Sequence, residues 1–465
     1  MSDDSRRVSL LLGLLFGLAG MGSSSAAVAV PLISDDFAIT AGQATWTISL
    51  YTLMLAVTTA VYGRVSDLVG IRLPLMVGTG LMTAGAVLAA AAPTFEVLLL
   101  ARLVQGAGAA AVPTLGVAVL NGRYSGAVRG LALGRLAGVA AAVSCLGPLV
   151  GGLVEHAFGW RAVMALPILG LLVLPLLWPA LTREGTGARL DLLGAVLVAL
   201  TAAGVVLLVQ SPSTGLVVAI AGVLLLALGA PATVAWVRRR PHGFLPVSVV
   251  RNSTVVRSAA AAAAVPSAWF ALLVAVPAVL VADGWEPWQV GVLLLPSALI
   301  ALVVPRIAGP AITRVGPSWA IAGGAVTAVV ALALASVGAA TTSAPVLGGA
   351  VLLVTVAFGT AQPAMTSAVA DAVEADVRGV ALGVATLVFL VGGSVGSAVV
   401  GGLGDPIGID RALLVLGVLP LVGLGVLAPQ LRPGRAAPLP EGASVATTPT
   451  MSTGSSICCR KERCV

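Results

Sequence analysis

The chain has 465 residues, of which 58% are apolar and 9% are charged, and its mean hydropathy is +1.08. A soluble domain could not bury so much apolar surface, so this composition excludes a soluble protein and indicates one surrounded by lipid. The formal net charge is +7, and the positions of the basic residues decide whether it signals a nucleic-acid partner or a membrane topology.

Apolar stretches long enough to cross a membrane recur along almost the whole chain. A bilayer core of about 30 Å needs about 20 apolar residues in a helix, and helices satisfy their own backbone groups in hydrocarbon. The predicted fold class is therefore an all-α polytopic membrane protein with 14 transmembrane helices. These helices are expected at 8–33, 46–63, 73–92, 95–120, 129–154, 159–180, 191–210, 215–237, 257–281, 288–309, 317–339, 345–369, 379–402 and 410–428.

The basic residues predict that both termini are cytoplasmic. An even number of helices leaves the two ends of the chain on one side of the membrane. With that side inside, all of the 25 basic residues except Arg102, Arg161 and Arg411 lie in inner loops, tails or inner helix ends, as the positive-inside rule requires. The net charge therefore reports topology, and no nucleic-acid partner is expected. A signal peptide is the competing interpretation of residues 1–33, but their apolar run is longer than a usual signal core.

Two repeated patterns indicate that the chain contains an internal duplication. Gly63, Gly70 and Gly78 return as Gly309, Gly316 and Gly324, an offset of 246 (309 − 63), and RGLALG at 129–134 reappears as RGVALG at 378–383. Paired halves in a hydrophobic chain are typical of transporters that rock about a central site. The predicted regions are a six-helix bundle at 1–182, a two-helix insert with cytoplasmic linkers at 183–256, a second six-helix bundle at 257–430 and a disordered cytoplasmic tail at 431–465.

The segment GRVSDLVGIR (63–72) combines glycines and charges at the cytoplasmic end of the second helix. An acid flanked by two arginines can form charge-assisted bonds to a neighbouring helix end in one conformational state only. The alternative is a solvated loop whose glycines make a tight turn. The second-half copy has Thr313 in place of the acid, so the charged contact is expected on one side only. The candidate gating residues are Gly63, Arg64, Asp67, Gly70 and Arg72.

Arg102 is predicted to lie on the order of 10 Å inside the helix at 95–120, at 1.5 Å per residue. A guanidinium at that depth costs at least about 2.5 to 3.5 kcal/mol unless it faces the bundle interior or a watery cavity. Arg102 is therefore a candidate for coupling protons or substrate, with Gln105 one turn further on as a partner. The alternative is that the side chain reaches outward along the lipid.

Small residues and a proline gather in the helix predicted at 129–154. Gly147, Gly151 and Gly152 permit another helix to approach closely, and Pro148 removes a backbone donor, so close packing with a bend is expected. Ser144 precedes them by about one turn. The alternative is ordinary packing of small residues between helices.

The chain lacks a clear mid-membrane carboxylate, because each Asp and Glu is expected in a loop or at a helix end. A dispersed cation would find no buried counter-charge, so a neutral or anionic amphiphile is the favoured substrate. If protons are coupled to transport, their acceptor must lie near a mouth of the protein. The candidates are Asp36, Glu155, Asp371 and His156.

A cavity for an amphiphile is mostly apolar with a few polar groups. The candidate lining residues, each equally suited to face lipid or a helix contact, are Thr52, Met54, Trp269, Phe270, Gln362 and Phe389. His156 and His242 make no metal-ligand pair, and no nucleophile has a buried base beside it. No metal, no cofactor and no enzymatic activity are therefore expected.

Three of these motifs resemble signatures of the major facilitator superfamily. GRVSDLVGIR is similar to its loop signature, RLVQGAGAAAVP (102–113) to its helix 4 signature, and GPLVGG (147–152) to the helix 5 signature associated with exporters. The helix count and the run WTISLYTLMLAVTTAVYGRVSD (46–67) are similar to the fourteen-helix drug:proton antiporter branch, which contains tetracycline and multidrug exporters of bacteria. The resemblance covers Arg7 to about Gln430.

This resemblance implies a major facilitator fold, with two six-helix bundles plus two inserted helices, in the cytoplasmic membrane of a bacterium. It implies a monomeric, secondary active efflux transporter that exports a small amphiphilic drug or antibiotic by alternating access in exchange for protons. It also implies that the helix 5 motif packs against the helix at 288–309. Many relatives carry an acid at the positions of Gly22 or Ser144, so these residues argue against coupling through a central carboxylate.

Two other functions are considered. An uncoupled flippase or importer of a lipid or metabolite fits the missing acids but not the exporter-type motif in helix 5. A non-transporting membrane sensor or scaffold is opposed by the retention of both gate loops and of Arg102.

Overall fold

The computed structural model describes residues 2–124, 126–181, 191–240, 247–374 and 378–431, and the regular structure of these residues is entirely helical. The first half contains α1 (Ser2–Asp36), α2 (Ala41–Ala44), α3 (Trp46–Val69), α4 (Arg72–Ala90), α5 (Phe95–Ala109), α6 (Ala111–Arg123), α7 (Gly126–Cys145), α8 (Gly147–Phe158), α9 (Trp160–Ala165), η1 (Leu166–Leu169), α10 (Gly170–Leu177) and η2 (Trp178–Ala180).

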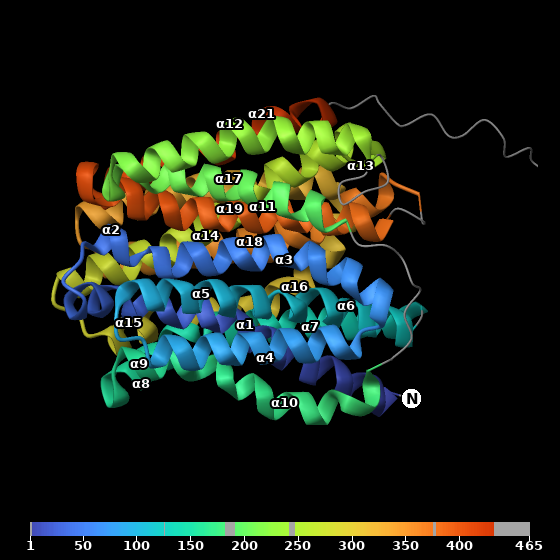
Figure 1. The fold of residues 1–465 in the computed structure, drawn as a ribbon, viewed down its shortest axis with the longest axis horizontal. Coiled ribbons are helices and arrows are strands. Elements are labelled where there is room, and N and C mark those ends of the chain that lie inside the picture. Colours follow the sequence, from blue (N-terminus) through green and yellow to red (C-terminus); the bar gives the residue numbers. More distant parts are fainter. Residues whose placement is uncertain (1, 125, 182–190, 241–246, 375–377, 432–465) are drawn as a thin grey trace, which may run out of the picture. The chain divides into compact units, whose positions relative to one another are not determined.

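The inserted pair consists of α11 (Leu192–Thr214) and α12 (Leu216–Arg239). The second half contains α13 (Val247–Arg251), α14 (Ser253–Ala282), α15 (Pro287–Leu293), α16 (Leu295–Val315), α17 (Pro317–Ala340), α18 (Ala344–Asp371), α19 (Arg378–Ile407), α20 (Ile409–Leu416) and α21 (Val418–Leu431). Figure 1 shows these helices lying along a common direction, with α2, α8 and α15 at one end and the N-terminus and α13 at the other. We call these ends the α2 end and the N-terminal end.

The spanning helices agree closely with the predicted ones. Thirteen helical stretches of the described residues are long and apolar enough to cross a membrane. The predicted helix at 191–210 corresponds to α11, which has 23 residues but a shorter described apolar run, Val196–Pro212. The fourteen predicted helices are thus thirteen such stretches together with α11. The region boundary at 182 and 183 and the tail beyond 431 fall outside the described residues, so the division into four regions remains a prediction.

The predicted duplication is visible in the backbone. Gly70 ends α3 with φ +78°, and Gly316, 246 residues later, ends α16 with φ +88°. A capping box of Thr40 and Gln43 opens α2, and a capping box of Glu286 and Gln289 opens α15 at the same offset. Glycine adopts a positive φ without the steric cost that a Cβ brings. The two halves therefore share turn geometry as well as sequence pattern.

The two halves share a large buried core at the α2 end, and a small buried cluster of α3, α11 and α19 also joins them. The large core joins residues such as Ile33 and Trp160 of the first half to Leu280 and Leu413 of the second. Towards the N-terminal end each half has its own core, one built only from first-half residues and the other only from second-half residues. The large shared core therefore lies at the α2 end, whereas each of the cores towards the N-terminal end belongs to a single half.

The inserted pair is attached through α11. In Figure 1, α11 lies between α12 and α3, and it packs on both of them and on α19. Val206 of α11 is fully buried in a small cluster with Leu53 of α3 and Ala398 of α19. The two inserted helices are joined by Thr201 and Thr233, whose Oγ1 atoms are 3.1 Å apart. The insert therefore contacts both halves through one helix.

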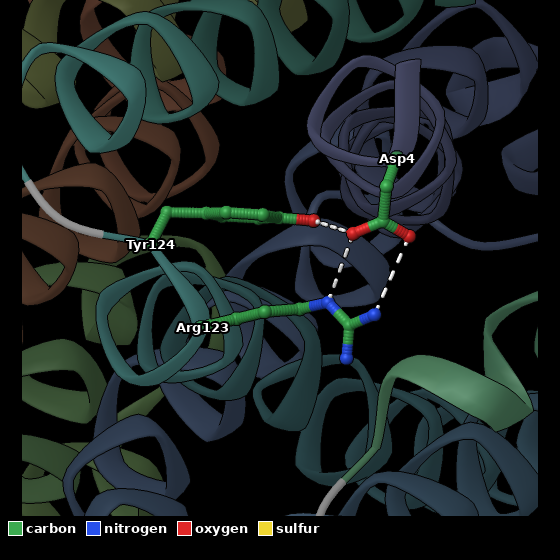
Figure 2. Close-up of polar contacts among 3 residues, drawn as sticks. All are labelled: Asp4, Arg123 and Tyr124. Atoms are coloured by element: carbon green, nitrogen blue, oxygen red, sulfur yellow. Dashed lines mark hydrogen bonds and ion pairs between the residues drawn. The ribbon is translucent and has the colours of Figure 1, made fainter. Parts of the chain in front are cut away.

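The start of α1 is bonded to the end of α6 at the N-terminal end. Figure 2 shows the Asp4 carboxylate accepting hydrogen bonds from Arg123 Nε (3.1 Å) and Nη2 (3.3 Å) and from the Tyr124 hydroxyl (2.7 Å). Burial, followed by the bond to Asp4, raises the pKa of the Tyr124 phenol, so Tyr124 remains a donor. Exposed ion pairs contribute about 0 to 1 kcal/mol, so this contact orients the first turn of α1 more than it stabilises the bundle.

Candidate functional site

Arg102 lies in α5, and its side chain is fully buried among helices of the first half. Its Nε donates to the backbone oxygen of Thr47 in α3 at 2.7 Å, and its Nη1 donates to Oε1 of Gln105 at 2.5 Å. The guanidinium carbon is 4.3 Å from the centroid of the Tyr51 ring. Arg102 is thus held by a carbonyl, an amide and an aromatic face. The Arg102 side chain therefore does not reach outward along the lipid, which was the alternative interpretation of the sequence.

The positive charge of Arg102 is stabilised by the dipoles of neutral groups and by the face of an aromatic ring. The ion pairs among the described side chains are Arg123 with Asp4 and Arg161 with Asp36, and both are exposed. The Nη2 atom of Arg102 and the Nε2 atom of Gln105 are buried and have no hydrogen-bond partner in the described part of the chain. Because both groups are donors, this cluster suits an acceptor such as a carbonyl or a carboxylate, and repels a cation.

Glycines bring the helices around Arg102 into backbone contact. A Cβ added at Gly106 would overlap the backbone of Tyr51 in α3, and a Cβ at Gly108 would overlap that of Met82 in α4. A Cβ at Gly85 would lie 2.5 Å from the backbone nitrogen of Gln105. Small residues permit such close approach between helices in lipid. The backbone around Arg102 is therefore closely packed and holds the guanidinium in a defined position.

The candidate gating residues lie around the turn between α3 and α4. Gly63 is half-buried in α3, and Gly70 is the buried residue with positive φ that ends this helix. Arg72 opens α4, and its guanidinium lies 3.3 Å from the centroid of the Trp178 ring. Arg64 and Asp67 belong to α3, but their side chains are outside the described part. The proposed charged contact of Asp67 therefore remains a prediction.

The helix 5 motif lies where the two halves meet at the α2 end. The helix is interrupted at Leu146, between α7 and α8, and α8 begins with Gly147 and Pro148. A Cβ at Gly152 would lie 2.6 Å from the Pro287 oxygen in α15 of the second half. The helix is thus broken immediately before the motif, while the expected bend stays a prediction. The motif contacts α15, the first part of the helix predicted at 288–309.

The other face of the motif packs on α1. A Cβ at Gly151 would lie 2.8 Å from the backbone oxygen of Ser25, and a Cβ at Gly147 would overlap the hydroxyl of Ser24. The Ser24 hydroxyl donates to the Ser144 backbone oxygen at 2.7 Å. The Ser144 hydroxyl is 3.4 Å from the Gly17 backbone oxygen. Ser144 thus joins helix 5 to helix 1 through hydroxyl and backbone groups.

Polar contacts between α3 and α19 also join the two halves. The hydroxyls of Ser49 and Ser397 are 3.0 Å apart, and the Ser394 hydroxyl donates to Thr52 Oγ1 at 2.9 Å. These four side chains are buried. Thr52, a predicted cavity residue, therefore lies between the packed halves.

The candidate proton acceptors are dispersed. Asp36 lies at the end of α1, where Arg161 Nη1 (2.9 Å) and Trp160 Nε1 (3.1 Å) donate to its Oδ2. Glu155 lies half-buried near the end of α8, whereas Asp371 is exposed at the end of α18. Asp36 and Glu155 are at the α2 end and Asp371 is at the other. None of the three contacts Arg102 in the part of the chain that the structure describes, where the partners of Arg102 are neutral groups.

Of the predicted cavity residues, the aromatic ones form a group in the second half. Trp269 lies 5.0 Å from Phe270 and 5.3 Å from Phe358 between ring centroids, and Phe358 lies 5.4 Å from Phe389. Phe358 was not selected from the sequence, because nothing in α18 distinguishes it from a lipid-facing phenylalanine.

The two remaining cavity candidates lie elsewhere. Gln362 is half-buried in α18. Met54 lines a lateral apolar groove of about 250 Å³ between α3, α5 and α11, together with residues such as Leu103 and Leu207. Met54 therefore lies on a different face of α3 from Thr52, whose partner is Ser394 of α19.

The family model described as Major Facilitator Superfamily matches residues 12–397. The chain belongs to the Major Facilitator Superfamily. This superfamily protein is a multi-pass membrane transporter and not an enzyme.

Several curated relatives of this superfamily member carry transport or resistance names. The lincomycin resistance protein of Streptomyces lincolnensis is 30% identical over 463 residues, which cover 91% of each chain. The multidrug resistance protein Stp of Mycobacterium tuberculosis is 28% identical over 383 residues, covering 80% of this chain and 71% of its own. The efflux pump dotC of Dothistroma septosporum is 33% identical over 166 residues, covering 35% and 28%.

Solved structures agree with this fold. A POT family transporter solved in complex with a thioalcohol-conjugated peptide superposes with a TM-score of 0.68, covering 92% of this chain and 96% of that one. Its sequence identity is 13%, so this likeness concerns the fold alone.

Proposed function

We propose that this protein exports a small amphiphilic drug or antibiotic across a bacterial cytoplasmic membrane by alternating access, as a monomer and in exchange for protons. Alternating access requires two bundles that separate at one end while they pack at the other. The observation that carries the proposal is the distribution of the buried cores, with one core common to both halves at the α2 end and separate cores towards the N-terminal end. The similarity to the lincomycin resistance protein over 91% of each chain supports export of an antibiotic.

The proposed orientation has the N-terminal end in the cytoplasm. Arginines such as Arg6, Arg123 and Arg239 belong to that end, whereas Arg161 and Arg411 lie in the first turns of α9 and α20 at the α2 end. Positive residues concentrate in short cytoplasmic loops. In this orientation the packed α2 end faces outward and the separately packed end faces the cytoplasm, as expected for an exporter about to load its substrate.

The proposed substrate is neutral or anionic. The Arg102 cluster offers two buried donors, Arg102 Nη2 and Gln105 Nε2, and among the described ion pairs no carboxylate accompanies them. A cation brought towards this cluster would meet an uncompensated positive charge in a low-dielectric medium. A carbonyl or carboxylate oxygen would accept the hydrogen bonds that these donors lack.

Cells that express the chain provide the test, with a panel of neutral, anionic and cationic antibiotics and with or without a protonophore. We expect neutral or anionic compounds to leave these cells faster than cells carrying an empty vector, and the protonophore to abolish the difference. Efflux that is unchanged by the protonophore would instead support transport that is not coupled to protons. Export of cationic compounds alone would contradict the proposed substrate class.

Glu155 is the carboxylate that we propose for proton coupling. It lies one turn beyond Gly151, and Gly152 contacts Pro287, the residue that follows Glu286 at the start of α15. Glu286 of the second half acts on Glu155 as a like charge, and His156, the next residue of α8, acts in the opposite sense. Asp35 and Asp36 lie at the end of α1, which packs on α8. Protonation of one carboxylate would remove their repulsion and favour packing of the two halves, because like charges destabilise a shared site.

Replacing Glu155 by glutamine is expected to remove most of the dependence of transport on external pH. Glutamine keeps the size and hydrogen-bonding capacity of the protonated acid but cannot titrate. The measurement is the export rate from proteoliposomes as external pH is varied from acidic to neutral values. Asp371→Asn is the matched control, because Asp371 is exposed at the opposite end. A pH profile unchanged by Glu155→Gln would remove Glu155 from the mechanism.

A further inference from the structure

The inserted helix α11 carries a buried amide at the point where the insert meets both halves. Gln210 is fully buried, and its Nε2 donates to Thr45 Oγ1 at 2.9 Å and to the Gly42 backbone oxygen at 3.3 Å. Gly42 belongs to α2, and Thr45 is the residue between α2 and α3, so both acceptors belong to the first half. The insert, which has no counterpart in the duplication, is therefore hydrogen-bonded to the α2 end of the first half.

The second half closes around the same side chain. A Cβ added at Gly402 of α19 would lie 2.9 Å from the Gln210 Cα, and a Cβ at Gly401 would lie 3.1 Å from the Gln210 Nε2. The Gly401 position also approaches Thr45 so closely that a Cβ there would overlap the threonine hydroxyl. The segment around Thr45, α11 and α19 leave no space for even one methyl group at Gly401 or Gly402, so their contact depends on both glycines.

This contact can exist only while the two halves are packed at the α2 end. Separation of α3 from α19 would also break the contacts of Ser49 with Ser397 and of the Gly42 amide with the Asp405 carboxylate at 3.2 Å. The α11 helix packs more extensively on α19 than on α3, so it would remain with the second half. The Gln210 amide would then lose its hydrogen bonds to Thr45 and Gly42, and the loss of hydrogen bonds by a buried donor is unfavourable.

We infer that the inserted helix is part of the gate, and that Gln210 is a positioning residue that holds the α2 end closed by bonding the second half, through α11, to the first. This inference rests on the proposed alternating-access function. The hydrogen bonds of Gln210 favour the packed state at the α2 end and oppose its opening. The inserted pair therefore shifts the equilibrium between the two conformations, in addition to occupying space between the bundles.

The test measures how readily the α2 end opens in the full-length protein. A Ser397→Cys reporter is introduced, and Cys145, Cys458, Cys459 and Cys464 are replaced by alanine in every variant. A bulky, membrane-impermeant maleimide is then applied to cells without substrate. We expect Gln210→Leu to raise the labelling rate of the reporter about tenfold, which corresponds to about 1.4 kcal/mol.

Thr201→Val is the matched control on the same helix. It removes the bond to Thr233 within the insert but leaves the contact between the halves unchanged, so we expect a labelling rate within about twofold of the reference. An unchanged rate with Gln210→Leu, or an equal rise with Thr201→Val, would overturn the inference. If Gln210→Leu does not reach the membrane, Thr45→Val removes the acceptor from the first half and is expected to raise labelling in the same way.

The result of this labelling experiment can be distinguished from the result of the export experiment that tests the proposed function. Labelling requires no substrate, so a rise with Gln210→Leu supports the inference even if no antibiotic in the panel is exported. Conversely, export with labelling that does not depend on Gln210 would retain the proposed function and overturn this inference.

Discussion

Replacement of Arg102 by alanine is expected to reduce export at least about a hundredfold. The change removes the donors to Thr47 and Gln105 and the cation above the Tyr51 ring. Hydrogen bonds to charged groups contribute about 1.5 to 3 kcal/mol each, and every 1.36 kcal/mol is a factor of ten, so the loss of two such bonds accounts for this magnitude. The measurement is the initial rate of antibiotic export from proteoliposomes of known protein content.

The Arg102→Lys variant tests whether export requires only a positive charge at this position or also the geometry of the guanidinium group. A lysine keeps the positive charge but cannot donate to Thr47 and Gln105 with the fixed geometry of a guanidinium. We expect Arg102→Lys to recover little of the export rate, although its unfolding temperature in detergent should stay nearer to that of the wild type. Wild-type export by Arg102→Ala would show that the buried cation has no part in transport.

Replacement of Gly152 by leucine is expected to shift the conformational equilibrium towards separation of the halves at the α2 end. The new side chain must begin 2.6 Å from the Pro287 oxygen and the Trp288 Cα, where real contacts are not found. Overpacking costs about 1 to 3 kcal/mol, and this penalty falls only on the packed state, so the ratio of open to packed protein should rise about 5- to 150-fold. Export should fall in parallel, and maleimide labelling of the Ser397→Cys reporter should rise.

Gly291→Leu repeats this test from the other half. A Cβ at Gly291 would lie 2.5 Å from the Leu149 Cα, so the same interface is obstructed from α15. Gly80→Leu is the matched control, because no heavy atom lies within 4 Å of a Cβ at this exposed position in α4. If all three variants label at the same rate, the contact of α8 with α15 does not control the α2 end.

The sequence by itself determined the membrane class, the spanning segments and the duplication. Membrane spans could be predicted because hydrocarbon requires a long apolar helix whatever its neighbours are. The paired turns could be predicted because a glycine with positive φ, such as Gly70 or Gly316, is a local requirement of the backbone. The burial of Arg102 and the break in the helix before Pro148 followed from local position in the same way.

Only the tertiary structure decided which side chains meet. Arg102 contacts Thr47 and Tyr51 of another helix, and Asp36 pairs with Arg161 at the α2 end. The sequence could not predict these contacts or the place of α11, since a helix that is apolar all round carries no amphipathic pattern to separate its lipid-facing side from its protein-facing side. Met54 and Phe358 illustrate this limit, because the packing of whole helices, and not the local sequence, sets the faces on which such residues lie.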